Sequence, residues 1–139
     1  MLTLVASAAR TADGNSGEIT SIQHPELLKS MHFLLDVTAA ATAVDDTLDV
    51  YVQFLYDGTN YTDLLHFTQV LGNGGAKKYI ADWIQGVTPE SEMLAPTDAT
   101  QAAGVLQGGV IGTAMRVKWV IVDAGADNAS FTFSVSASW

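Results

Sequence analysis

Residues 47–56 read TLDVYVQFLY, and their alternation of side-chain types decides the fold class. Every second residue from Leu48 to Phe54 is apolar, and the residues between them are Asp49, Tyr51 and Gln53. Successive side chains of a strand point to opposite faces, whereas a helix would scatter these residues around its surface. The stretch therefore predicts a half-buried antiparallel strand with one apolar and one polar face.

The same period of two recurs on both sides of this stretch. It predicts strands at 31–39, 113–123 and 131–136, further strands at 62–71 and 77–85, and a strand or an extended arm at 2–8. Short strands separated by turns are typical of layered β folds. The prediction is an all-β chain, a single antiparallel β-sandwich or jelly roll of about seven to eight strands.

Turn chemistry supports these boundaries. Asp57-Gly58 is a strong hairpin signal between two strand-like runs. Residues 72–75, Gly-Asn-Gly-Gly, predict a second tight reversal. We interpret it as a hairpin and not a phosphate-binding loop, because no Ser/Thr and no helix follow. Residues 25–29 could form one helical turn.

Two segments do not follow the strand pattern, and they define the expected domain organisation. Residues 1–30 are expected to be an N-terminal strand or arm, and residues 31–139 a β-sandwich domain with one long loop at 86–112. A loop of that length is unusual in a compact domain. Its apolar side chains predict that it drapes over a neighbouring chain or over its own domain, the alternative being a flexible insertion.

Composition excludes several classes of partner. Six basic and 15 acidic residues give a net charge of −9, which would repel a phosphate backbone and an anionic membrane surface. The absence of cysteine removes disulfides and thiolate sites. No apolar stretch is long enough for a membrane-spanning helix, and no basic signal-peptide start precedes the apolar N-terminus. We therefore expect synthesis in the cytoplasm and use there or in a particle assembled there.

The polar residues form no familiar catalytic or cofactor motif. The histidines, His24, His32 and His66, lack metal-ligand spacing and are expected to be polar surface residues. Asp45, Asp46 and Asp49, or Asp57 with Asp63, could offer oxygens to calcium, but the spacing does not match a calcium loop, and solvated acidic turns are expected instead. We expect no enzyme activity, no cofactor, and no catalytic or metal-binding residues.

The aromatic residues leave a carbohydrate-binding function open. Flat rings stack on sugars, although tyrosines are more often interface or sheet-surface residues. Trp119 is in phase with Met115 and Val117, which predicts a core position, whereas Tyr51 is expected on the opposite face of its strand. The C-terminal Trp139 is expected to pack on the core or on a neighbouring subunit.

Residues 47–64, TLDVYVQFLYDGTNYTDL, together with MHFLLDVTA at 31–39, resemble a small β-sandwich protein found in the structural modules of tailed bacteriophages. The similarity continues through HFTQV at 66–70, MRVKWV at 115–120 and SFTFSVS at 130–136, and so covers most of residues 31–139. The long segment 86–112 departs from the short connection expected there. The resemblance implies a virion component, with a head decoration (cement) protein as the first expectation. A head–tail or tail structural protein, or a carbohydrate- or receptor-binding module, is the alternative.

The resemblance also implies partners and a location. The expected partners are the major capsid protein or other virion proteins, within a homo-oligomer for which a trimer is favoured; nucleic acid and membrane are not expected. The expected location is the capsid surface of the virion, assembled in the host cytoplasm. Expected interface residues are Leu2, Leu4, Tyr51, Met93, Leu94, Leu106 and Trp139. If residues 1–30 form an arm that reaches the shell, deletion of residues 1–20 should leave a folded domain.

Overall fold

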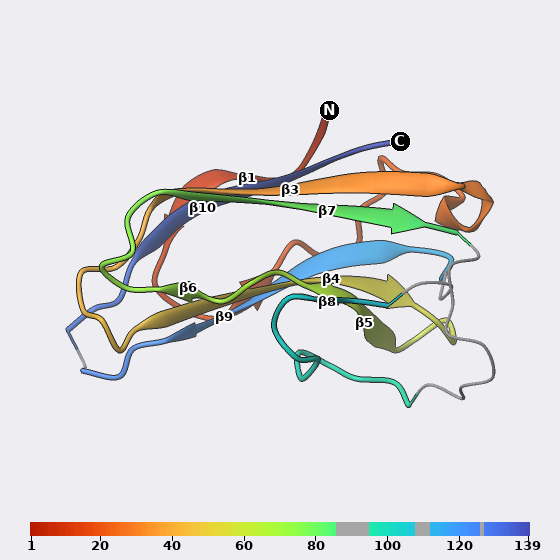
Figure 1. The fold of residues 1–139 in the computed structure, drawn as a ribbon. Helices are drawn as coiled ribbons and strands as arrows, with labels where there is room; N and C mark the ends of the chain where they lie inside the picture. Colours follow the sequence, from red (N-terminus) through yellow and green to blue (C-terminus); the bar gives the residue numbers. More distant parts are fainter. Residues whose placement is uncertain (86–94, 108–111, 126) are drawn as a thin grey trace.

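The computed structural model describes residues 1–85, 95–107, 112–125 and 127–139, and it shows two antiparallel sheets packed face to face (Figure 1). Sheet A has the strand order β1-β10-β3-β7. Sheet B has the order β2-β9-β4-β5-β8, with β6 also pairing with β4. The strands are β1 (Leu2–Arg10), β2 (Gly14–Asn15), β3 (Ser30–Ala39), β4 (Thr47–Leu55), β5 (Tyr61–His66), β6 (Val70–Leu71), β7 (Lys77–Ile84), β8 (Val105–Leu106), β9 (Met115–Val122) and β10 (Phe131–Ser138). The all-β sandwich predicted from the sequence is confirmed.

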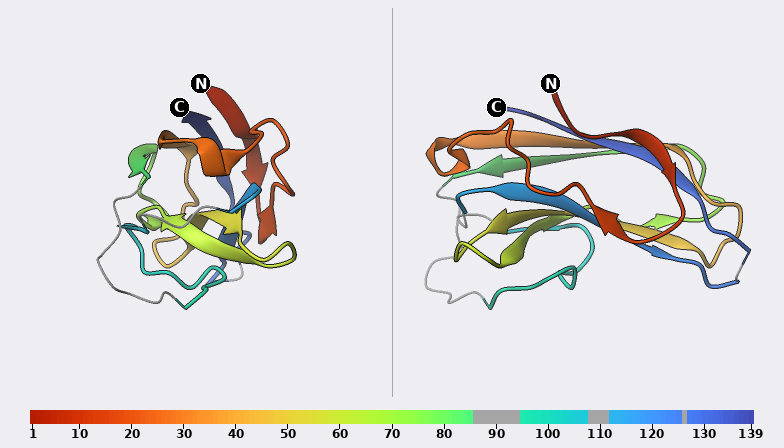
Figure 2. Two further views of the ribbon diagram at one scale, coloured as in Figure 1. Left: turned by 90° about the vertical axis from the view of Figure 1, so that its right-hand side faces the viewer. Right: turned by 180° about the vertical axis from the view of Figure 1, so that it is seen from behind.

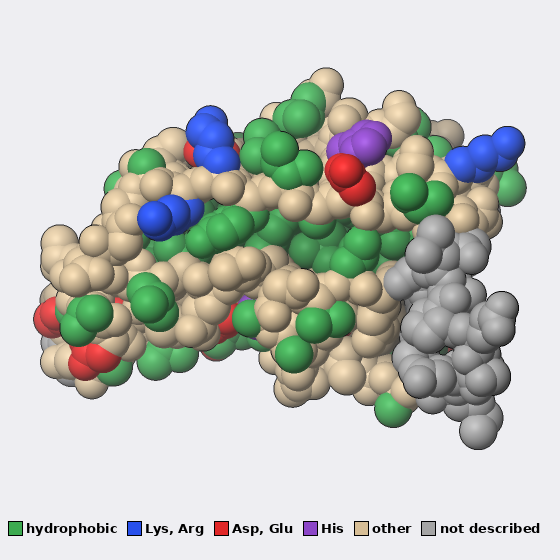
Figure 3. All heavy atoms as spheres, viewed as in Figure 1, with side chains coloured by type: hydrophobic (Ala, Val, Ile, Leu, Met, Phe, Trp, Pro, Cys, Tyr) green, Lys and Arg blue, Asp and Glu red, His purple; other side chains and the backbone are tan. Residues whose placement is uncertain are grey.

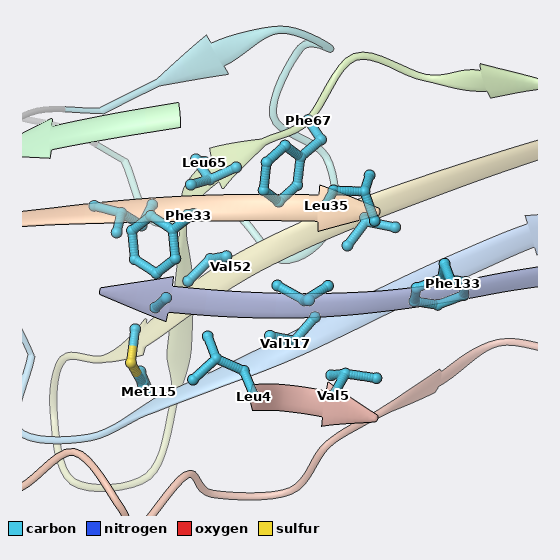
Figure 4. Close-up of a cluster of buried hydrophobic side chains, with 14 of the residues drawn as sticks. Leu4, Val5, Phe33, Leu35, Val52, Leu65, Phe67, Met115, Val117 and Phe133 are labelled. Atoms are coloured by element: carbon cyan, nitrogen blue, oxygen red, sulfur yellow. The ribbon is translucent and has the colours of Figure 1, made fainter. Parts of the chain in front are cut away.

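The hydrophobic core lies between the two sheets (Figure 4). The apolar positions of β4, from Leu48 to Phe54, are fully buried, as are the inward positions of β3 and β10. Trp83 of β7 makes an edge-to-face contact with Phe54, with ring centroids 6.4 Å apart. The alternation of apolar residues read from the sequence therefore corresponds to the inner faces of the sandwich.

The additional strands are short. The predicted strand at 62–71 is divided into β5 and β6, because residues 67–69 leave the ladder between them while the Phe67 amide still donates to the Val50 carbonyl at 3.0 Å. The two-residue strands β2 and β8 lie in segments that carry no period-two pattern. The predicted helical turn is a 3-10 helix at Pro25–Leu27.

The N-terminal segment is part of the sandwich and not an arm. β1 pairs with β10 from Leu2 to Arg10, and the chain then crosses to sheet B, where β2 pairs with β9 (Figure 2). Register shifts along β1 allow two consecutive residues, Leu4 and Val5, to be buried. The strand alternative for 2–8 is confirmed, and β1 and β2 join the sheets formed by residues 31–139.

Two predicted turns have different outcomes. The Asp57-Gly58 hairpin joins β4 to β5: Gly58 has φ 84°, and the Tyr56 amide donates to the Asn60 carbonyl at 3.0 Å. Residues 72–75, by contrast, carry the chain from β6 in sheet B to β7 in sheet A, so they form a crossover and not a hairpin. Gly72 is required there, because a Cβ at this position would lie 1.7 Å from the Ala43 carbonyl oxygen.

The described part of the segment 86–112 packs on its own domain. Residues 97–101 hydrogen bond to β5, and β8 pairs with β5 at the edge of sheet B. Residues 86–94 and 108–111 lie outside the described residues. In the part of the chain that is described, no helix has the length and apolar character needed to span a membrane.

Candidate functional site

A polar cluster lies on the outer face of sheet B beneath residues 97–101. We call it the loop-anchoring cluster, and its members are Asp49, Gln53, Asp63, His66 and Asp98. Asp49 and Gln53 flank Tyr51 on the outward face of β4. Asp63 and His66 belong to β5, and Asp98 belongs to the covering loop. The first four are buried, so β4 is covered on both faces. The polar face that the sequence predicted for β4 is present, but the loop covers it and shields it from solvent.

Asp63 is the centre of this cluster. Its side chain is fully buried and accepts four hydrogen bonds. Three come from consecutive backbone amides, Ala99 at 3.0 Å, Thr100 at 3.1 Å and Gln101 at 3.2 Å. The fourth comes from Nε2 of Gln53 at 2.7 Å. A buried carboxylate is stable only when such donors satisfy it, so Asp63 fixes the loop on the sheet.

Gln53 and Asp98 connect this centre to two basic residues of β9. Gln53 donates to Asp98 at 2.8 Å and accepts a 2.7 Å hydrogen bond from Nε of Arg116. Lys118 donates to the same Asp98 oxygen at 2.8 Å. These bonds to Lys118 and Gln53 hold the pKa of Asp98 below its ordinary value. The loop is thus fastened by charged as well as backbone contacts.

His66 forms the other end of the cluster. Its Nε2 lies 2.8 Å from Oδ1 of Asp49, and its Nδ1 lies 2.7 Å from the Gln101 carbonyl oxygen. Its ring stacks on Tyr51, with centroids 4.0 Å apart. Burial opposes protonation, but the hydrogen bonds to Asp49 and Gln101 outweigh it and raise the pKa of His66 above 6.5. Burial, then the charges of Asp49 and Asp63, raise the pKa of Tyr51 to about 12.

The arrangement is suited to holding structure more than to catalysis. Both nitrogens of His66 are engaged by acceptors, and in the described residues no hydroxyl group hydrogen bonds to this ring. A general base needs a free nitrogen within reach of the proton it removes. The Gln101 side-chain amide is buried without a hydrogen-bond partner among the described residues.

A polar cavity of about 300 Å³ opens at the hairpin end of the sandwich. Its lining includes Tyr56, Asn60, Tyr61, Asp98 and Arg116. The guanidinium group of Arg116 lies over the Tyr61 ring, 4.1 Å from the centroid, while Tyr56 is 43% exposed. An exposed ring beside amide, carboxylate and guanidinium groups has the chemistry that recognises polar small molecules such as sugars.

A cluster of three aspartates lies among the turns at the other end of the sandwich from this cavity. Carboxylate oxygens of Asp46, Asp123 and Asp127 fall within 4.8 Å of one another and could hold a cation. Asp46 is only 1% exposed and accepts a 3.1 Å hydrogen bond from the Ala124 amide. Burial and the neighbouring carboxylates raise its pKa. The groupings considered from the sequence are not formed here, because Asp49 and Asp63 belong to the loop-anchoring cluster and Asp57 caps its own turn.

The predicted interface residues are separated by the fold. Leu4 is in the core and Tyr51 stacks beneath the loop, so neither can form an outer surface of this chain, which corrects both predictions. Leu2 is partly buried against the core, Leu106 is half-exposed on β8, and Trp139 is 55% exposed. Met93 and Leu94 lie outside the described residues.

Sequence reasoning also misplaced His66, which was expected on the surface and is buried. The signal that could have indicated this burial is the polar face of β4. Asp49 and Gln53 alternate with core residues, and once the loop covers them they need buried hydrogen-bond partners such as His66 and Asp63. Trp119, expected in the core, is partly buried against it and makes an edge contact with Phe133 at 5.8 Å. Comparison with family models, curated proteins and solved structures gave no match to this chain.

Proposed function

We propose that the chain is a structural component of a tailed-phage virion and acts as a decoration protein that stabilises the capsid shell by protein–protein contacts. The resemblance of most of residues 31–139 to phage structural proteins supports this proposal. The loop-anchoring cluster also supports the proposal. Its side chains hydrogen bond to the covering loop and so have a structural role within the chain. On this proposal the chain has no enzymatic role.

The observation that carries the proposal is an apolar patch where the two termini meet. Met1 is 75% exposed and Trp139 is 55% exposed. They border one surface hollow together with Leu2, Ala137 and Ser138, and the two chain ends lie near each other beside sheet A (Figure 1). Large apolar side chains gathered on a surface mark a contact with another protein, since burying them removes apolar area from water. We assign this terminal patch to the shell.

The test is co-sedimentation of the purified protein with capsids that lack it. Saturable binding at a fixed copy number, with greater resistance of the shell to heat, is the expected result. Trp139→Ser should weaken binding by tenfold or more. Val122→Ser is the matched control, because Val122 is also exposed but lies in sheet B. Absence of binding by the unmodified protein overturns the decoration role.

A saccharide-binding function is a second candidate, favoured by the cavity beside Tyr56. Saturable binding of a glycan in an array, abolished by Tyr56→Ala but not by Leu71→Ala, would support it. Leu71 is exposed to a similar degree and does not border that cavity. Equal binding by both variants would place the glycan elsewhere.

A further inference from the structure

The edges of the two sheets differ in how well they are protected against pairing. In sheet B the described edge strands, β2 and β8, have two residues each. In sheet A the edge strand β1 is interrupted by two register shifts along its pairing with β10. Short strands and bulges are the usual means by which proteins prevent edge-to-edge association. Among the described edge strands, β7 alone is both long and regular.

β7 pairs with β3 through eight residue pairs without a register shift. Beyond its end the Gln85 amide donates to the Lys29 carbonyl at 2.8 Å, so odd-numbered positions direct their backbone groups toward β3. In an antiparallel ladder these directions alternate along the strand. The backbone groups of Lys78, Ile80 and Asp82 therefore point away from β3, along the open edge of the sheet.

The side chains of the same three residues lie on the outer face of sheet A. Ile80 is 75% exposed, which is unusual for a large apolar side chain in the middle of a strand. Lys78 precedes it by two positions and Asp82 follows it by two. Figure 3 views this side of the molecule, with basic, apolar and acidic side chains distributed along the upper sheet. The order along the strand is basic, apolar, acidic. When an identical strand lies beside it in the antiparallel direction, each charged residue therefore faces a residue of opposite charge.

We propose that β7 pairs with β7 of a second copy of this chain, antiparallel and across a two-fold axis at Ile80. In this register Ile80 faces Ile80 of the second copy, Lys78 faces Asp82, and Asp82 faces Lys78. A shift of two residues in either direction loses both charge pairs. The two four-stranded sheets then form one continuous sheet of eight strands.

Contacts within the chain extend the charge complementarity across the joined sheet. Lys78 donates to Asp36 of β3 at 2.7 Å, and Asp82 contacts His32 of β3. In the dimer, a row of facing side chains therefore crosses four neighbouring strands on each side of the axis. Its order is Asp36, Lys78, Asp82 and His32, and the last two belong to the second copy. Opposite charges directly across neighbouring strands stabilise pairing and like charges oppose it. The middle row is apolar, because Leu34 lies opposite Ile80 in the β3–β7 ladder.

The hollow beside this edge is also apolar. A cavity of about 110 Å³ lies between β7 and β8, and its lining includes Ile80, Ala81, Val105 and Leu106. Val105 and Leu106 are partly exposed. A second strand along β7 would shield this hollow, which gives the predicted interface residue Leu106 a place in the contact.

This contact does not depend on the decoration role, and it specifies a two-fold arrangement. A self-complementary edge is isologous, so it closes as a dimer, whereas the trimer expected from the resemblance would need two different patches. The alternative role of Lys78 is protective: charged residues on edges also prevent association. That role predicts a monomer, so the oligomeric state separates the two.

The first experiment combines light scattering of the full chain with a cysteine at the axis. The chain has no cysteine, so Ile80→Cys introduces a single thiol. Facing residues in a hydrogen-bonded pair have Cα atoms about 5.5 Å apart, which a disulfide can span. We expect a dimer by scattering and rapid disulfide formation in Ile80→Cys but not in the exposed control Val122→Cys. A monomer or trimer, or equal crosslinking of both variants, overturns the proposal.

The second experiment tests the register through charge. Lys78→Glu places like charges across the axis, and so does Asp82→Lys, so each variant alone should be monomeric. Their mixture restores both opposite-charge pairs and should form a heterodimer, whereas Lys77→Glu should remain dimeric. Circular dichroism of each variant verifies that these exposed substitutions leave the fold intact. Failure of the mixture to associate while the unmodified chain is dimeric would exclude this register.

Discussion

His66 Nε2 and Asp49 Oδ1 lie 2.8 Å apart on the covered face of sheet B, and the other ring nitrogen of His66 faces the carbonyl oxygen of Gln101. A carboxylate and a carbonyl are both acceptors, so both contacts are satisfied only by the doubly protonated ring. Below the raised pKa of His66, the β5 strand and the covering loop are therefore joined through a protonated ring.

The stability supplied by His66 should depend on pH. Its folded pKa lies above 6.5, so between 6.5 and the folded pKa the native state binds more protons than the unfolded state. This contribution is fully present below pH 6.5 and is lost as pH rises through the folded pKa. Urea unfolding from pH 5.5 to 9 should show the free-energy difference between the unmodified chain and His66→Gln shrinking as pH rises. A constant difference would mean that folding does not change the pKa of His66, and a difference that grows as pH rises would mean that the folded protein keeps the ring neutral.

Asp63→Asn should detach the loop from sheet B. An amide offers one acceptor atom and places a donor against amides that must donate, so several of the four hydrogen bonds are lost. Bonds to charged groups contribute about 1.5–3 kcal/mol each, and we expect a net loss of about 3 kcal/mol.

Hydrogen exchange gives the local measurement for that variant. The amides of residues 99–101 should exchange much faster in Asp63→Asn than in the unmodified chain. Asp45→Asn is the control, since Asp45 is exposed and should change stability by no more than about 0.5 kcal/mol. Unchanged protection of residues 99–101 would show that the loop is held by other contacts.

Asp46→Asn should stabilise the chain at neutral pH. The pKa of Asp46 is raised by burial and by neighbouring carboxylates, so its ionised form opposes folding above that pKa. Asparagine removes the charge and can still accept from the Ala124 amide. The gain in melting temperature should disappear in acid, where the aspartate is protonated as well. A lower melting temperature together with calcium stabilisation of the unmodified chain would instead identify a cation site.

Deletion of residues 1–10 should abolish cooperative folding. It removes the buried side chains of Leu4 and Val5, the partner of β10, and the Arg10 guanidinium that lies 4.4 Å from the Phe133 ring centroid. Loss of two buried aliphatic residues costs about 5 kcal/mol or more, which is comparable with the stability of an ordinary domain. Near-ultraviolet circular dichroism gives the measurement. Removal of Met1 alone should be harmless, and a folded deletion variant would restore the arm interpretation of residues 1–20.

The sequence determined the two-layer β architecture because period-two alternation depends only on which side chains need burial. Residues 47–55 illustrate this: Leu48, Val50, Val52 and Phe54 had to share one face, and they line the core. The hairpin at Asp57-Gly58 was equally predictable, since Gly58 supplies the positive φ that the turn requires. Such local signals need no knowledge of distant segments.

Only the tertiary structure decided the environment of the other face. Asp63 and His66 became buried because residues 97–101, more than 30 positions along the chain, cover them and supply amide donors and a carbonyl acceptor. Likewise, β7 became an open edge because β3 is the one described strand that pairs with it. Strand order and loop placement arise from contacts between segments far apart in the chain, which alternation within one segment does not encode.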